Sequence, residues 1–210
     1  MPYFLWDWNG TLLDDTQAAV NALNGMLAVR GLPPIGLDFY RERFAFPVKP
    51  FYAAAGFRLA EEDWDALARE YHAAYGREPL RLNAEAREAL AAVRAAGAGQ
   101  SVVSALRQDL LCAAVTQTGV ADFFDYVWGT DNLDGDSKID RARELLGRLP
   151  SRGPFVLIGD SLHDREVADA IGARCVLCSQ GSHSAARLRA VAPTAETLCE
   201  AVRMALESVR

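Results

Sequence analysis

Carboxylates, a lysine and a serine lie in this chain directly beside short apolar runs. Asp7 follows YFLW, and Ser104 ends the run QSVVS. Asp160 follows VLIG, and Asp164 comes four residues later; Lys138 begins a helical pattern. Carboxylate oxygens are hard ligands that suit Mg²⁺, and a carboxylate can also act as a nucleophile. An ammonium and a hydroxyl can bind the oxygens of an anion. Together, these kinds of functional group suit a reaction of an anion beside a bound cation.

The segments around these residues alternate between apolar runs and helical patterns, which predicts βαβ units and a doubly wound parallel sheet. The expected strands are 3–8, 100–104, 123–128, 154–158 and 174–178. The expected helices of this part are 84–97, 108–118, 138–148, 163–171 and about 194–208. The fold class is therefore α/β, with a Rossmann-like sheet that has helices on both faces.

A helical insertion interrupts this alternation after the first strand. Helical spacing of apolar residues predicts a helix over about 15–31, which Gly31 ends. Shorter helices are expected within 37–76, and no strand is predicted between 14 and 82. We expect two domains, which are an α/β core at 1–14 and 82–210 and a helical cap at 15–81.

In open parallel sheets, ligands bind beyond the carboxyl ends of the strands. Asp7, Ser104 and Asp160 each stand at the end of an expected strand, and Lys138 stands at the start of an expected helix. Folding is therefore expected to bring these four residues together, although they are far apart in the sequence.

Four segments resemble, in order, the four motifs of the haloacid dehalogenase superfamily. DWNGT, which contains Asp7, resembles the first motif, and Ser104 resembles the hydroxyl residue of the second. Lys138 resembles the lysine of the third, and GDSLHD, with Asp160 and Asp164, resembles the fourth. A helical insertion directly after the first motif is typical of the C1-capped members, which include phosphoglycolate phosphatase-like enzymes. The resemblance covers the whole chain and implies a hydrolase, most simply a phosphatase.

The resemblance also implies a magnesium site. Asp7 would be both the nucleophile and a metal ligand, with Asp160 as the second carboxylate and the main-chain carbonyl of Asn9 as a third ligand. Asp164 would orient the metal-bound waters or Lys138. Mg²⁺ is the expected cofactor, since one or two carboxylates with substrate and water are its usual partners.

A phosphate-binding set follows from the same resemblance. Lys138 and Ser104 would hold the oxygens of the transferring group. Gly10 and Thr11 lie in the turn whose backbone N–H groups would face the phosphate. Ala105, next to Ser104, would add a further contact. The expected partner is a small phosphorylated metabolite.

The same residues have structural interpretations as well. Aspartate and serine often cap helices, so Lys138 could begin a helix that Asp136 or Ser137 caps. Asp14 and Asp15 are interpreted as acids at a helix start. We favour the site because all four motifs occur together.

Asn9 departs from the family pattern, which has aspartate at this position to protonate the leaving oxygen and then activate water. An amide cannot exchange a proton in this way, and such help typically gives about 10²–10⁴-fold in rate. Three explanations remain open. The substrate could have a good leaving group, such as an acyl or aryl phosphate. His163, a cap residue or a metal-bound water could replace the acid. The protein could also be a weak enzyme that mainly binds phosphate ligands.

A lysine in the expected cap supports an alternative reaction. Phosphonoacetaldehyde hydrolase also lacks the aspartate and uses a cap lysine to form a Schiff base. Lys49 lies at a similar distance from Asp7 along the chain, so hydrolysis of a C–P bond remains a hypothesis. On the substrate side we expect Phe44, Phe46, Lys49 and Arg107.

Composition excludes several other classes. The 210 residues carry a net charge of −6 and contain no run of Lys or Arg, which argues against nucleic acid as a partner. No apolar stretch reaches about 18 residues, and the first residues do not resemble a signal peptide. Cys175 and Cys178 are expected to be buried thiols. A cytoplasmic location follows; the oligomeric state, monomer or dimer, stays open.

Overall fold

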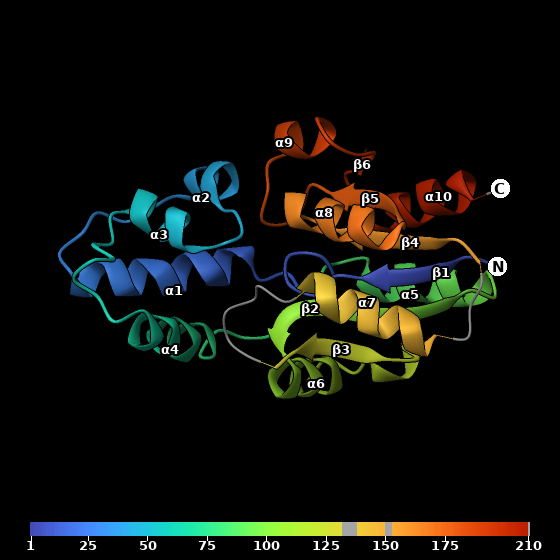
Figure 1. Cartoon of the computed structure of the whole chain (residues 1–210), viewed down its shortest axis with the longest axis horizontal. Coiled ribbons are helices and arrows are strands. Elements are labelled where there is room, and N and C mark those ends of the chain that lie inside the picture. Colours follow the sequence, from blue (N-terminus) through green and yellow to red (C-terminus); the bar gives the residue numbers. More distant parts are fainter. Residues whose placement is uncertain (132–137, 150–152, 210) are drawn as a thin grey trace.

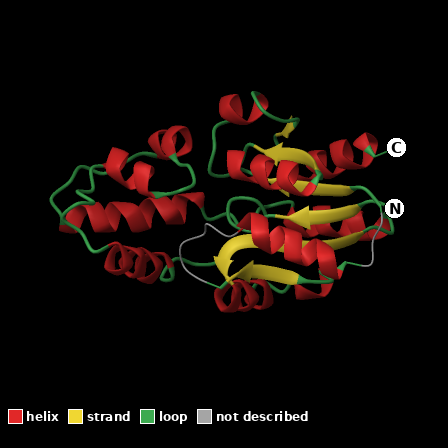
Figure 2. Cartoon of the chain, in the orientation of Figure 1, coloured by secondary structure: helices red, strands yellow, loops and turns green. Residues whose placement is uncertain are grey.

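One parallel sheet forms the centre of the larger part of the molecule (Figures 1 and 2). The computed structural model describes residues 1–131, 138–149 and 153–209. The strand order is β3-β2-β1-β4-β5-β6, and each neighbouring pair is parallel. The strands are β1 (Tyr3–Trp6), β2 (Gly99–Arg107), β3 (Val127–Thr130), β4 (Phe155–Gly159), β5 (Arg174–Cys178) and β6 (Thr194–Ala195). The predicted fold class is confirmed.

Helices cover both faces of the sheet because each strand alternates its side chains between the faces. On β1, Phe4 and Trp6 enter one core cluster, which includes residues of α5 (Ala86–Ala95), α6 (Gln108–Gln117) and α10 (Leu198–Ser208). Tyr3 and Leu5 enter a second cluster on the opposite face. This cluster includes residues of α7 (Lys138–Arg148), α8 (Leu162–Ile171) and α9 (Ala185–Arg189).

Four helices form a separate layer beyond the carboxyl ends of the strands (Figure 1). They are α1 (Thr16–Val29), α2 (Leu37–Arg43), α3 (Lys49–Ala55) and α4 (Trp64–Tyr75). These helices share their own apolar cluster, with Leu23, Leu27 and Phe51 among its buried members. A helical cap is therefore present, and no strand is described between residues 14 and 81. We call residues 16–75 the cap below.

Two chain segments connect the cap to the sheet, and they run side by side. Leu13 and Leu82 form an antiparallel bridge. The Asp14 N–H donates to the Arg81 carbonyl at 2.8 Å. This paired joint lies where the chain leaves and re-enters the sheet domain, so it fixes one end of the cap close to the end of β1.

Some predicted elements differ from the observed ones. The predicted strand 123–128 is wrong in its first half, because Ala121–Phe123 forms a short 3-10 helix (η1) and the strand starts at Val127. The predicted last helix starts too early, since Thr194–Ala195 forms β6 and Thr197 caps α10 by accepting from the Glu200 N–H. The short helix α9 was not predicted.

Candidate active site

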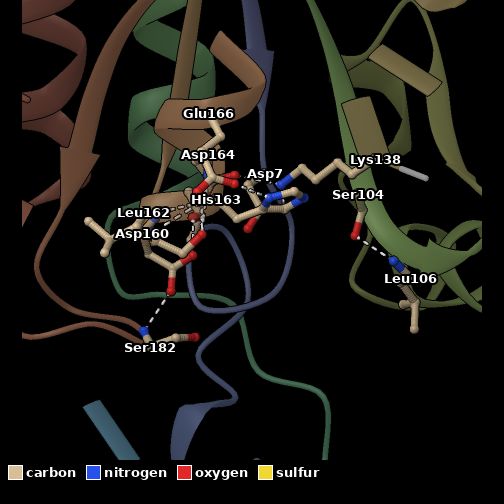
Figure 3. A network of polar contacts seen from close by, with 12 residues as sticks. Asp7, Ser104, Leu106, Lys138, Asp160, Leu162, His163, Asp164, Glu166 and Ser182 are labelled. Atoms are coloured by element: carbon tan, nitrogen blue, oxygen red, sulfur yellow. Dashed lines mark hydrogen bonds and ion pairs between the residues drawn. The ribbon is translucent and has the colours of Figure 1, made fainter. Parts of the chain in front are cut away.

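Asp7, Lys138 and Asp164 form a buried ion cluster at the carboxyl end of the sheet (Figure 3). The Lys138 Nζ lies 2.6 Å from Asp7 Oδ1 and 2.5 Å from Asp164 Oδ1. The other Asp164 oxygen accepts from the main-chain N–H groups of Asp160 and Ser161. Both oxygens of Asp164 are therefore occupied, which suits a residue that positions its neighbours.

Asp160 lies beside this cluster and is held from two sides. Thr11 Oγ1 donates to Asp160 Oδ1 at 3.0 Å, and the Ser182 N–H donates to Oδ2 at 2.5 Å (Figure 3). Gly10 makes this approach possible, because its φ is +75° and a Cβ there would clash with the Asp160 carboxylate. The β1 turn therefore needs glycine at this position. No sequence pattern pointed to Ser182, because it donates through its main chain.

Ligand oxygens of Asp7, Asp160 and Asp164 all lie within 4.8 Å of one another. Three buried carboxylates face one ammonium, that of Lys138, which leaves two negative charges uncompensated if all are ionised. Burial accordingly raises the pKa of Asp7 well above its usual range, and raises that of Asp160 to about 6. Burial also acts on Asp164, but the Lys138 charge lowers its pKa overall. A divalent cation would compensate this charge.

The predicted phosphate-binding residues on β2 lie at a cavity between the ion cluster and the cap. Ser104 and Ala105 both line it, and Ser104 is 1% exposed. The Ser104 hydroxyl accepts from the Leu106 N–H at 3.1 Å, so its own hydrogen stays available for donation (Figure 3). Lys138 begins α7, and the two cap candidates that precede it lie outside the described residues.

Asn9 makes contacts that the sequence did not predict. Its Nδ2 donates to Asp15 Oδ2 at 2.7 Å and to the Tyr75 hydroxyl at 3.0 Å. Asp15 also accepts from the Gly10 N–H at 2.6 Å and from the Tyr75 hydroxyl. Burial raises the pKa of Asp15, although these three donors oppose the rise.

Asp15 does stand at the N-cap position of α1, as interpreted, but its carboxylate has a different role from an ordinary helix-start acid. It precedes α1, but its side chain makes no capping hydrogen bond and is 7% exposed. The carboxylate turns instead toward the β1 turn, where an asparagine amide and two further donors need an acceptor. No spacing rule connects Asn9 with Tyr75, which is 66 residues away.

A cavity of about 180 Å³ opens between the ion cluster and the cap. The catalytic candidates Asp7, Asn9, Lys138 and Asp160 line its core end. Side chains from all four cap helices line the other end, and many of them are aromatic. The cap therefore forms the wall that a bound ligand would contact.

The four residues expected on the substrate side divide into two pairs. Phe44 and Phe46 line the cavity. Lys49 does not line it; its ammonium lies 4.9 Å from the centre of the Trp64 ring. Arg107 does not line it either and forms an ion pair with Asp109 at 2.6 Å. The phenylalanines thus remain substrate-side candidates.

His163, which follows Asp160 in the fourth motif, also lines the cavity. Its Nδ1 lies 3.0 Å from Glu166 Oε2, and its ring packs 5.0 Å from the Phe46 ring. Its Nε2 is buried and has no hydrogen-bond partner among the described residues. This nitrogen therefore has an unused hydrogen-bonding capacity in a residue that lines the cavity.

Comparison with known proteins decides the family. The model of a family described as haloacid dehalogenase-like hydrolase matches residues 4–178. The chain belongs to this family. The match extends from β1 to β5 and includes the cap, so the predicted resemblance is confirmed, and with it the prediction of a hydrolase.

Two curated proteins that are similar to this chain carry the same name. A phosphoglycolate phosphatase of Rhodobacter capsulatus is 28% identical, over 86% of this chain and 85% of that protein. A phosphoglycolate phosphatase of Caulobacter vibrioides is 30% identical, over 84% of this chain and 78% of that protein. The prediction of a phosphatase-type hydrolase agrees with these relatives.

A solved structure shares the fold under a different name. Protein tyrosine kinase A of Mycobacterium tuberculosis is 25% identical and superposes with a TM-score of 0.78, over 98% of each chain. One fold can therefore carry differently named activities, and the reaction has to be argued from the site.

Proposed function

We propose that this chain is a magnesium-dependent phosphohydrolase that acts on a small phosphorylated metabolite through an aspartyl phosphate at Asp7. The observation that carries the proposal is the convergence of Asp7, Asp160, Asp164 and Lys138 at the closed end of one cavity. Buried carboxylates whose negative charge exceeds the positive charge beside them rarely serve stability alone. A divalent cation is the partner that such a cluster lacks, and a phosphate dianion could approach Asp7 once that cation is bound.

The donor set fits Mg²⁺ by its chemistry. Asp7 and Asp160 would hold the ion with the main-chain carbonyl of Asn9, all through hard oxygens. Asp164 is less suited as a ligand because main-chain donors and Lys138 occupy its oxygens. When bound, the ion would neutralise the negative charge that otherwise keeps Asp7 away from a phosphate dianion.

The remaining residues would hold the substrate for in-line attack. Lys138 places its ammonium 2.6 Å from the nucleophile, where it can also contact a phosphoryl oxygen. The Ser104 hydroxyl would donate from β2, and the Thr11 N–H of the β1 turn would face the phosphate, whereas the Gly10 N–H already donates to Asp15. Fixed donors of this kind stabilise the charge that develops on the transferring group.

Catalysis would proceed in two steps on Asp7. The carboxylate attacks phosphorus and the alcohol leaves, which gives an acyl phosphate on Asp7. Water then attacks that phosphorus and releases inorganic phosphate and the free carboxylate. The cap would exclude bulk water while the first step occurs.

The C–P hydrolase alternative loses its main support in the cap. A Schiff base requires a lysine amine at the substrate carbonyl. Lys49, the lysine considered for this role, packs on Trp64 and does not line the cavity. We therefore prefer the phosphohydrolase.

A cytoplasmic location is consistent with this proposal. The four cysteines are free, and Cys175 and Cys178 are buried as expected, which accords with a reducing compartment. In the described part of the chain, we find no helix with the length and hydropathy needed to cross a bilayer.

Phosphate release with and without Mg²⁺ tests the proposal. Wild type should release phosphate from a panel of phosphorylated metabolites only when Mg²⁺ is present. Asp7→Asn should lower the rate at least about 10³-fold, because the nucleophile is lost. Release that is equal in Asp7→Asn, or that persists in excess chelator, would contradict the proposal. Ligand-dependent stabilisation without turnover would indicate a protein that only binds phosphate compounds.

A further inference from the structure

We propose that the substrate of this site is the phosphate monoester of a phenol, an aryl phosphate. The inference rests on the proposed phosphohydrolase function and specifies its substrate class. Two independent features support it. They are the composition of the cavity wall and the hydrogen bonds of Asn9.

Rings form much of the cap side of the cavity. Its lining includes aromatic side chains from α2, α3 and α4, together with small apolar residues such as Ala19 and Ala68. Aromatic rings gain packing energy from edge-to-face and offset contacts with another ring. A planar aromatic group suits this wall better than a short polar chain does. The aromatic side chains of this wall include Tyr40, Phe44, Phe51, Tyr52, Trp64 and Tyr71.

The charge of the lining argues against a second anionic group on the substrate. Among the described residues, the lining contains no arginine and one lysine, Lys138, which Asp7 and Asp164 already engage. Residues 132–137, NLDGDS, contain no Lys or Arg. A carboxylate held against the cap rings would be desolvated without a fixed counter-charge. Histidines also line the cavity, but imidazole is cationic mainly below neutral pH.

Two largely buried tyrosines offer hydroxyl groups deeper in the cap. Tyr40 and Tyr52 are 4% and 6% exposed and line the cavity. Neither hydroxyl makes a hydrogen bond to another residue within the described ranges. A hydroxyl can both donate and accept a hydrogen bond. A ring that carries a hydroxyl, carbonyl or amide group would supply a partner.

The leaving group follows from the contacts of Asn9. Both hydrogens of its amide are used, one by Asp15 and one by Tyr75. Residue 9 therefore has no hydrogen to give to the oxygen that leaves phosphorus. A phenol ionises near pH 10, as tyrosine does, whereas an aliphatic alcohol is far less acidic. A phenolate can depart without being protonated.

The reaction balances without an acid at residue 9. An Asp7 oxygen forms a bond to phosphorus as the bond from phosphorus to the aryl oxygen breaks, and the electron pair stays on the phenolate. The released phenolate takes a proton from water. Hydrolysis of the aspartyl phosphate then consumes one water and yields inorganic phosphate, a proton and the original carboxylate.

Three esters separate leaving-group chemistry from ring binding. Phenyl phosphate has an aromatic ring and a phenolate leaving group, benzyl phosphate has an aromatic ring but an alkyl oxygen as leaving group, and cyclohexyl phosphate has a saturated ring and an alkyl oxygen. With Mg²⁺, wild type should show a kcat/KM for phenyl phosphate at least about 10²-fold above those for the other two, since general acid help is worth about that much. Benzyl phosphate should inhibit competitively with a Ki below that of cyclohexyl phosphate.

The variant Asn9→Asp, measured with the same esters, tests whether residue 9 limits the choice of leaving group. It restores a proton donor, so kcat/KM for benzyl phosphate should rise more than that for phenyl phosphate, and their ratio should narrow by about tenfold or more. A wild type that hydrolyses benzyl phosphate as fast as phenyl phosphate would overturn the leaving-group argument. So would an unchanged ratio in Asn9→Asp.

A pair of variants on α4 tests the cavity itself. Ala68 lines the cavity, while Ala66 on the same helix is exposed and does not. Ala68→Leu should raise the KM for phenyl phosphate at least about fivefold and that for the smaller acetyl phosphate by less. Ala66→Leu should leave both KM values within about twofold. Equal effects of the two variants would overturn the proposed ring site.

The outcomes distinguish the inference from the function on which it rests. Turnover of phosphoglycolate or cyclohexyl phosphate at least equal to that of phenyl phosphate, dependent on Mg²⁺ and lost in Asp7→Asn, would overturn the substrate class alone. No turnover of any ester above the Asp7→Asn background would overturn the phosphohydrolase as well.

Discussion

At the scale of single residues, the molecule places charged groups where their solvation is poor. Asp7, Lys138, Asp160 and Asp164 are all below 8% exposed. The ammonium of Lys138 lies 2.6 Å from Asp7 and 2.5 Å from Asp164 but leaves Asp160 without a cationic partner in the described part of the chain. Asp160 is therefore the residue whose protonation should respond most to a bound cation.

Magnesium binding should depend on pH through Asp160, whose pKa rises to about 6 in the fold. The folded state without metal holds the Asp160 proton more tightly than the unfolded state. The free energy of unfolding that Asp160 contributes is therefore lost as pH rises from about 4 through 6. Mg²⁺ must displace that proton, so its apparent affinity should be about tenfold weaker at pH 5 than at pH 7. Thermal unfolding with and without Mg²⁺ measures this.

The matched variant for this prediction is Asp160→Asn, which should lose most of the Mg²⁺-dependent rise in Tm. A rise in Tm that is the same at pH 5 and pH 7 would show that Asp160 does not hold the ion.

Asp15 should contribute to stability through the three donors that it accepts from. Asp15→Ala would leave the Asn9 amide, the Gly10 N–H and the Tyr75 hydroxyl without this partner. Such buried unpaired groups cost about 1–3 kcal/mol in the free energy of unfolding, which urea denaturation can measure. Asp14→Ala is the control, because Asp14 is exposed and should change stability by less than about 0.5 kcal/mol. Equal effects of the two substitutions would contradict this role.

At the scale of elements, contacts between α2 and the segment after β5 hold the cap against the sheet domain. Arg41 on α2 donates to the carbonyls of Gln180 and Gly181, at 2.8 and 3.0 Å. Arg187 on α9 donates to the carbonyls of Arg41 and Phe44, at 2.6 and 3.1 Å. His183 lies in the same segment and is 2% exposed.

His183 should make this contact region sensitive to acid. Burial, with the nearby Arg187 charge, lowers the pKa of His183 from 6.5 to about 4. The unfolded state therefore binds the proton more tightly, and stability is lost as pH falls from about 6.5 through 4. The loss is at most about 3 kcal/mol. Urea denaturation at pH 7 and pH 4.5 should show a smaller pH effect in His183→Gln. An identical pH effect in both proteins would contradict the assignment.

At the scale of the whole molecule, most of the sheet could be predicted because apolar runs alternate with helical patterns. Asp7 and Asp160 were expected to meet because both follow buried strands, and parallel strands end at one edge. Lys138 could be placed there by the family pattern. The meeting of Asp7 and Asp160 needs only local sequence and the rules of α/β topology, whereas the placement of Lys138 also needs the resemblance to the family.

Contacts between cap and core could not be predicted in the same way. Asn9 meets Tyr75 because α4 ends beside the β1 turn, and nothing in the local sequence fixes that approach. Lys49 was a reasonable substrate-side candidate by distance along the chain, but α3 directs it onto Trp64. Asp15 looked like a helix-start acid because its role depends on partners that folding supplies.

The most direct test of the account is to locate the covalent phosphoryl group. We would mix the protein with Mg²⁺ and phenyl phosphate, quench in acid, reduce any acyl phosphate with borohydride and map the modified peptide by mass spectrometry. The account predicts one modified residue, Asp7, with none in Asp7→Asn or without Mg²⁺. A modification at another residue, or steady phosphate release with no covalent adduct at Asp7 at any quench time, would contradict it.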